Sequence, residues 1–66
     1  MYKNESRELL RNELKNAGGN FDIIVFRNDC KRIIRALEDL RIFWCEHDGE
    51  ILTNRHELYN AVLPKE

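Results

Sequence analysis

Residues 41–53 read RIFWCEHDGEILT, two apolar stretches joined by the dipeptide Asp48-Gly49. An Asp-Gly pair between β-prone residues favours a two-residue hairpin, because a type I′ turn requires positive φ at both central positions. The segment is therefore predicted to form a β-hairpin with a fixed register. The facing pairs are then His47 with Glu50, Cys45 with Leu52, and Trp44 with Thr53.

The predicted hairpin has two apolar faces, because successive side chains of a strand point to opposite sides. One face carries Phe43, Cys45, His47 and Leu52, and the other carries Ile42, Trp44 and Ile51. Three short helices can cover one face of a small sheet fully and the second only in part. The remainder is then a candidate interface for a partner or a second copy. The alternative is that helices flank both faces and all these residues are core.

The rest of the chain predicts three helices and one more strand. Residues 4–17 form a helix that Gly18 or Gly19 stops, and residues 29–40 form a second with a continuous apolar stripe. Residues 21–27 are expected to form a central strand, since Ile23–Phe26 is apolar at every position. Residues 55–63 form the third helix, capped by Asn54 and ended by Pro64.

These elements give an α+β fold in a single small domain, residues 1–66, with the order α-β-α-β-β-α and a three-stranded sheet. Helix 29–40 and the hairpin supply most of the expected core, with help from the first helix. The expected core residues are Ile23, Val25, Ile33, Ile34, Leu37, Leu40, Phe43, Leu52, Leu10 and Leu14.

Length and charge exclude several classes of protein. The chain has 66 residues, 11 Lys+Arg and 12 Asp+Glu, for a net charge of −1. That size leaves no room for a multidomain enzyme, and the charge supplies no overall attraction to nucleic acid or anionic membrane. The longest apolar run, Ile23–Phe26, is far shorter than a membrane span, and the first eight residues are too polar for a signal peptide. We expect a cytoplasmic protein with no membrane partner.

Cysteines and histidines leave three alternatives open. Cys30 and Cys45 lie fifteen residues apart without a CxxC pair. They are expected to be reduced, buried thiols, although one disulfide bridge is conceivable. A zinc site built from Cys45, His47 and His56 with Cys30 is the third alternative, but this spacing matches no standard ligand pair. We expect no metal.

Catalytic machinery is almost absent from the sequence. Ser6 is the single serine, and Gly18-Gly19 precedes a strand where a phosphate-binding loop would follow one. Cys45 and His47 are the one conceivable nucleophilic pair, and no third group is placed to orient them. We therefore expect no enzyme, no catalytic residue, no cofactor and no small-molecule substrate.

Two sets of basic residues stand out. Helix 29–40 has Lys31, Arg32 and Arg35 in its first half and acidic residues in its second, which opposes the helix dipole. Such a half-helix is either a docking point for phosphate or acidic protein, or a solvated face paired with neighbouring glutamates. Arg7, Arg11 and Lys15 form a row on the first helix, expected to be solvated surface.

Residues 33–53, the end of a helix, a strand, an Asp-Gly turn and a returning strand, loosely resemble the recognition helix and wing of winged-helix domains. The resemblance implies nucleic-acid binding, with Arg27, Lys31, Arg32 and Arg35 on phosphates. Two features depart from that family. A strand precedes the helix where the family has another helix, and the wing tip, Glu46 to Glu50, is acidic where contact with phosphate favours basic residues.

The sequence favours a small, non-enzymatic protein-interaction or regulatory module, and we also expect a homodimer. The hairpin aromatics supply apolar contacts and helix 29–40 supplies a charged rim. The predicted partner-binding residues are Trp44, Phe43, Ile42, Arg32 and Arg35. Nucleic-acid binding through Arg27, Lys31, Arg32 and Arg35 is the alternative function.

Overall fold

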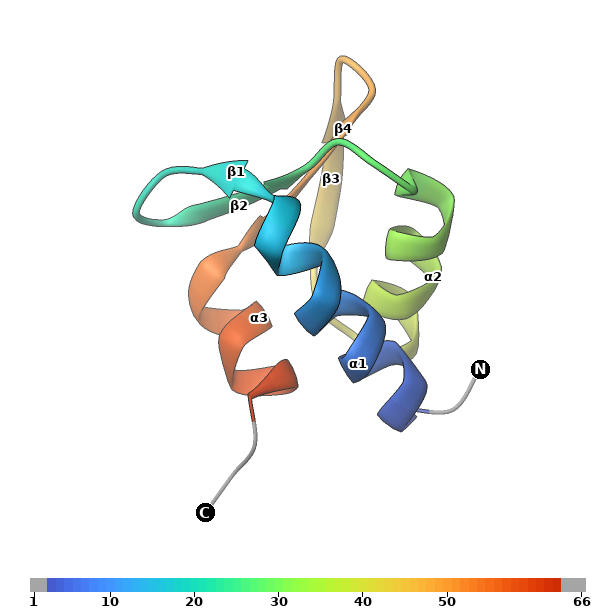
Figure 1. Ribbon diagram of the computed structural model, residues 1–66. Coiled ribbons are helices and arrows are strands. Elements are labelled where there is room, and N and C mark those ends of the chain that lie inside the picture. Colours follow the sequence, from blue (N-terminus) through green and yellow to red (C-terminus); the bar gives the residue numbers. More distant parts are fainter. Residues whose placement is uncertain (1–2, 64–66) are drawn as a thin grey trace.

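The computed structural model describes residues 3–63 and has an α+β fold, as the sequence predicts (Figure 1). The helices and strands follow the order α-β-β-α-β-β-α. They are α1 (Lys3–Glu13) continued by a 3₁₀ turn (Leu14–Asn16), β1 (Gly18–Gly19), β2 (Ile23–Phe26), α2 (Cys30–Asp39), β3 (Trp44–His47), β4 (Glu50–Asn54) and α3 (Arg55–Val62).

The strands form one antiparallel sheet in the order β1-β2-β4-β3. In the β3–β4 hairpin, Trp44 faces Thr53, Cys45 faces Leu52 and His47 faces Glu50, so the predicted register is confirmed. Asp48 and Gly49 have φ values of 51° and 80°, as a type I′ turn requires.

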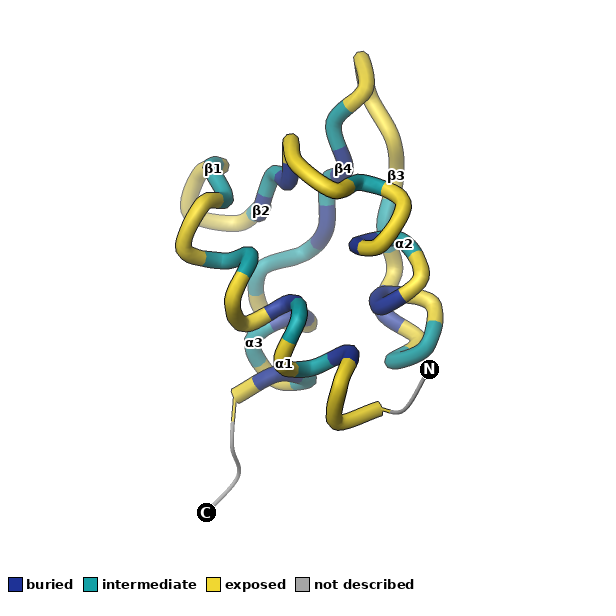
Figure 2. Tube along the Cα trace, turned by 45° about the vertical axis from the view of Figure 1, so that its right-hand side comes forward, coloured by how far each residue is buried: buried dark blue, intermediate teal, exposed yellow. Residues whose placement is uncertain are grey.

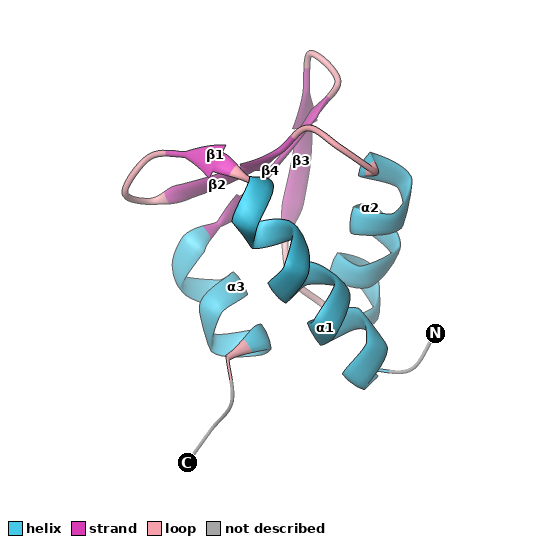
Figure 3. Ribbon diagram, viewed as in Figure 1, coloured by secondary structure: helices cyan, strands magenta, loops and turns pink. Residues whose placement is uncertain are grey.

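All three helices lie on one side of this sheet (Figures 1 and 3). The residues of β2 and β4 that point to the helices are buried: Ile24, Phe26, Ile51 and Thr53. They pack with the buried residues of the helices, which are Leu10, Ile33, Ala36, Leu37, Leu58 and Val62. The buried positions therefore gather between the sheet and the helices, and exposed positions dominate β3 and the hairpin tip (Figure 2).

The predicted three-stranded sheet lacks β1, which the structure adds. Gly18 and Gly19 pair with Val25 and Ile24 and do not end the helix. That helix already leaves the α conformation after Glu13. Two consecutive glycines carry no side-chain pattern that could indicate a strand.

The predicted core was wrong about which face of the strands points inward. Ile23, Val25 and Leu52 are only half-buried, on the face away from the helices, and Phe43 is 71% exposed. Their neighbours Ile24, Phe26 and Ile51 fill the core. Because β2 is apolar at every position, its pattern cannot distinguish one face from the other.

The first turns of α2 and α3 begin differently. The Asn54 side chain accepts a hydrogen bond from the Glu57 amide, so the predicted cap of α3 is confirmed. Asp29 precedes α2 with φ 52° and makes no side-chain cap. Pro64 lies outside the described residues. Within residues 3–63, no helix has the length and apolar character needed to cross a membrane.

Gly19 is the glycine whose replacement is expected to cost most. Its φ is +123°, and a Cβ there would lie 2.1 Å from the backbone oxygen of Ile23. Gly19→Ala should lower the free energy of unfolding by about 3 kcal/mol, since neither the backbone angle nor the space suits a side chain. Gly49→Ala is the matched control: its φ is +80° but a Cβ meets nothing within 4 Å. It should cost about 1 kcal/mol. Equal losses in urea unfolding would contradict the steric argument.

Candidate interaction surface

The sheet face away from the helices is the candidate interaction surface, called the open face below. The register places its side chains in three levels along the strands. The middle level holds Val25, Leu52 and Cys45, and one end level holds Ile23 beside the polar Asn54. Phe43 lies directly before β3, outside the paired residues. None of the five residues Ile23, Val25, Leu52, Cys45 and Phe43 is buried, and Phe43 and Cys45 are exposed.

The third level of the open face holds Arg27, Glu50 and His47, which faces Glu50 across the hairpin. Arg27 follows β2 and Glu50 begins β4, and the Arg27 Nε donates to Glu50 Oε2 at 2.5 Å. The two side chains remain 59% and 34% exposed, so solvent screens this pair and its contribution to stability is small. The pair also places a positive and a negative group side by side at the hairpin end of the apolar surface.

The predicted hairpin contacts do not lie on one surface. Ile42 is only 6% exposed, belongs to the core, and donates its backbone N–H to the Leu37 carbonyl. Trp44 faces Thr53 on the helix side of the sheet and packs against the core at half burial. Phe43 alone of the three is exposed, next to β3 and in phase with Cys45.

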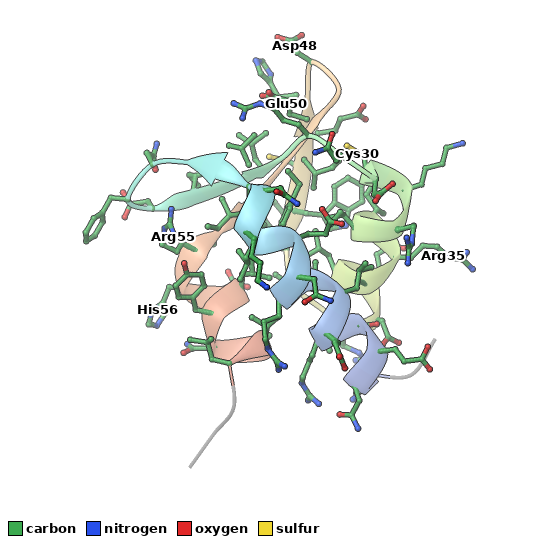
Figure 4. All side chains as sticks on the ribbon, viewed as in Figure 1. Cys30, Arg35, Asp48, Glu50, Arg55 and His56 are labelled. Atoms are coloured by element: carbon green, nitrogen blue, oxygen red, sulfur yellow. The ribbon has the colours of Figure 1, made fainter. Side chains whose placement is uncertain are left out.

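The predicted basic contacts are separate from the open face. Lys31, Arg32 and Arg35 are exposed on α2, and Arg35 projects away from the body of the molecule (Figure 4). Arg27 lies on the sheet and pairs with Glu50. Within residues 3–63, no ion pair engages the three basic residues of α2, so the expected pairing with neighbouring glutamates is not found.

The basic row of α1 has a structural role that the sequence did not indicate. Arg7 Nε donates to the Ala61 carbonyl at 3.0 Å, and Arg11 donates to the Val62 carbonyl through Nε and Nη2 at 3.1 and 2.6 Å. These carbonyls end α3, where helix oxygens lack intrahelical partners and a positive charge is favourable. Lys15, the third residue of the row, is exposed and makes no such contact within residues 3–63.

An open hollow of about 710 Å³ lies between the turn at residues 19–22 and the start of α3. The guanidinium of Arg55, which lines this hollow, already has hydrogen-bond partners within the chain. Arg55 donates to the carbonyls of Asn20 and Phe21 and to the Tyr59 hydroxyl, and its guanidinium lies 5.5 Å from the Tyr59 ring centre. All three nitrogens of the Arg55 guanidinium therefore already donate within the chain, which leaves this side chain poorly suited to hold a ligand in the hollow.

The cysteines and histidines do not come together in the structure. Cys30 and Cys45 are both free thiols; Cys30 is half-buried at the start of α2, and Cys45 is exposed on β3. His47 is near the hairpin tip and His56 is on α3, on the other side of the view in Figure 4 from Arg35. In residues 3–63, no three His, Cys, Asp or Glu side chains are grouped so that they could hold a metal ion.

Comparisons with protein-family models, with curated protein sequences and with solved structures gave no match. The function is therefore argued from the residues of this chain alone. Sequence reasoning found Phe43, Cys45 and Leu52 as one face of the hairpin but missed Ile23 and Val25. These two join the face only through the β2–β4 pairing, which no local signal in the sequence specifies.

The contacts of Arg11 with α3 predict a stability difference between two basic residues of α1. Arg11→Met keeps most of the aliphatic stem and removes two hydrogen bonds to Val62, so it should cost about 1–2 kcal/mol of unfolding free energy. Lys15→Met, at an exposed position of the same row, should change it by less than about 0.5 kcal/mol. The check is thermal unfolding, where each 1 kcal/mol corresponds to about 4–8 °C in a domain of this size. Equal Tm values would mean that Arg11 is ordinary solvated surface.

Proposed function

We propose that this chain is a non-enzymatic protein-interaction module that binds its partner through the open face. The observation that carries the proposal is the sheet face that the helices do not cover, where Ile23, Val25 and Leu52 are half-buried and Cys45 is exposed, with the 71% exposed Phe43 directly before β3. Contiguous exposed apolar surface on a small protein is typical of a binding site, and an aromatic side chain is a common energetic centre of such sites.

The position of the open face supports this function further. The face belongs to a sheet whose strands β2 and β4 are packed against the core on their other side, so their side chains are held on rigid strands. A rigid apolar surface loses little conformational entropy on binding, which favours affinity. Arg27 and Glu50 supply a polar border at one end, the arrangement of an apolar centre with a charged rim that protein interfaces commonly have.

Nucleic-acid binding through Arg27, Lys31, Arg32 and Arg35 is the competing function, and it has weaker support. Arg27 is paired with a carboxylate, and the hairpin tip adjoining it carries Glu46 and Asp48. The basic residues of α2 are exposed and unpaired within residues 3–63, so they remain the part of the chain best suited to phosphate. Binding of this kind weakens steeply as salt rises.

The proposal predicts different results for two neighbouring aromatic residues. Phe43→Ser removes an exposed side chain and should abolish partner capture while changing the free energy of unfolding by less than about 0.5 kcal/mol. Trp44→Ala opens space on the helix side and should cost about 2 kcal/mol. The measurement is capture from source-cell lysate by the immobilised protein, with unfolding measured in parallel.

Nuclease treatment of the lysate separates the two candidate functions. Capture that survives nuclease and is lost in Phe43→Ser supports the open face. Capture that disappears with nuclease or at high salt, and that depends on Arg32 and Arg35 but not on Phe43, would overturn the proposal in favour of nucleic-acid binding.

A further inference from the structure

We infer that the partner of the open face is a second copy of this chain, in a symmetric dimer whose two-fold axis runs parallel to the strands between β2 and β4. The inference rests on the proposed function, because it names the occupant of the same surface. It is carried by the way in which charge and apolar side chains are ordered along and across the sheet.

The apolar middle level is self-complementary under this symmetry. A two-fold axis parallel to the strands keeps each level opposite its own level and exchanges β2 with β4. Val25 and Leu52 are partners across β2 and β4, so Val25 of one copy faces Leu52 of the second copy, and the reverse contact repeats it. Neither residue is buried in the single chain.

The charged level is complementary in the same arrangement. Arg27 lies just after β2, and Glu50 begins β4. The axis therefore brings the guanidinium of one copy opposite the carboxylate of the other, twice. Each existing Arg27–Glu50 pair becomes part of a four-charge group of alternating sign, in which every charge keeps an opposite neighbour.

The other face-to-face arrangement conflicts with the order of the levels. An axis perpendicular to the strands would place Arg27 against Ile23 and Glu50 against Asn54 of the second copy. The guanidinium would then lie against an apolar side chain, and the second copy would offer neither charge an opposite one, which is costly. The order of charged and apolar levels along the strands therefore favours the two-fold axis parallel to the strands.

The size of the molecule is compatible with such a dimer. A specific interface of standard size buries about 800 Å² on each partner. That is about one sixth of the accessible surface of 4897 Å². One side of a body this small can supply it, and the open face is the side on which none of the helices of residues 3–63 lies (Figure 3).

The experiment is sedimentation equilibrium of the full chain across a concentration series, with Arg27→Glu and Glu50→Arg alone and mixed. The wild type should dimerise. Each variant alone places like charges opposite each other and should raise the dimer dissociation constant about tenfold or more. An equimolar mixture should recover dimers, because one chain then carries two carboxylates and the other two guanidinium groups at this level. Absence of recovery in the mixture would overturn the arrangement.

Two further measurements distinguish failure of the dimer from failure of the proposed function. A wild type that stays monomeric at all concentrations overturns the dimer, and the capture experiment with Phe43→Ser then tests the open face by itself. Leu52→Lys should prevent dimerisation while the chain stays folded by circular dichroism. A dimer that persists in folded Leu52→Lys would overturn the open-face dimer, because association would then use another surface, and the capture experiment would again test the open face by itself.

A spin label on Cys45, in a Cys30→Ser chain, tests the geometry directly. The two-fold arrangement separates the two Cys45 backbones by about 14 Å across the strands and about 10 Å between the sheets, so roughly 17 Å in all. Pairing of two β3 edges would instead bring them within about 6 Å and permit a disulfide. A label separation near 17–25 Å supports the face-to-face dimer, and a separation near contact would overturn it.

Discussion

The contacts of α1 with α2 and α3 determine which face of the sheet the helices cover. Its arginines hold the last carbonyls of α3, and Ser6 Oγ donates to Asp39 Oδ2 at the end of α2 at 2.8 Å. Leu10, between these contacts, is fully buried. The helix is therefore fixed across α2 and α3, on the side of the sheet that they already cover. Within residues 3–63, no further helix remains for the other side, and that sheet face stays open.

The same contacts explain part of the charge pattern of α2. Its acidic second half opposes the helix dipole, but Asp39 accepts a hydrogen bond from a buried serine of α1. A tertiary contact of this kind outweighs a dipole effect of a few tenths of a kcal/mol. Lys31, Arg32 and Arg35 have no comparable partner within residues 3–63, and nothing in the structure explains why they stand in the first half of the helix.

Local signals in the sequence were sufficient for the hairpin and the helices, because their chemistry is local. Asp48-Gly49 specifies a turn and hence a register, and Asn54 specifies a helix start. Local signals do not decide which face of β2 points to the helices. Ile-Ile-Val-Phe offers apolar side chains on both sides, and only the packing of Ile24 and Phe26 into the core with the buried residues of the helices decides it. The open face joins two strands that are distant in the chain, with Val25 and Leu52 separated by 27 residues, so its composition depends on which face of β2 is buried.

Stability and association are linked in a protein of this size. A chain of 66 residues buries a smaller fraction of its surface than a larger domain, so its folded state has a small margin. Covering Val25, Leu52 and Phe43 adds apolar burial that the single chain cannot achieve, and binding stabilises the folded form in proportion to the logarithm of partner concentration. The open face then contributes to the fold through the partner. A polar residue in place of Leu52 would remove that contribution and leave the stability of the isolated chain almost unchanged. The apolar side chain at this half-buried position of the sheet therefore stabilises the protein mainly through the partner.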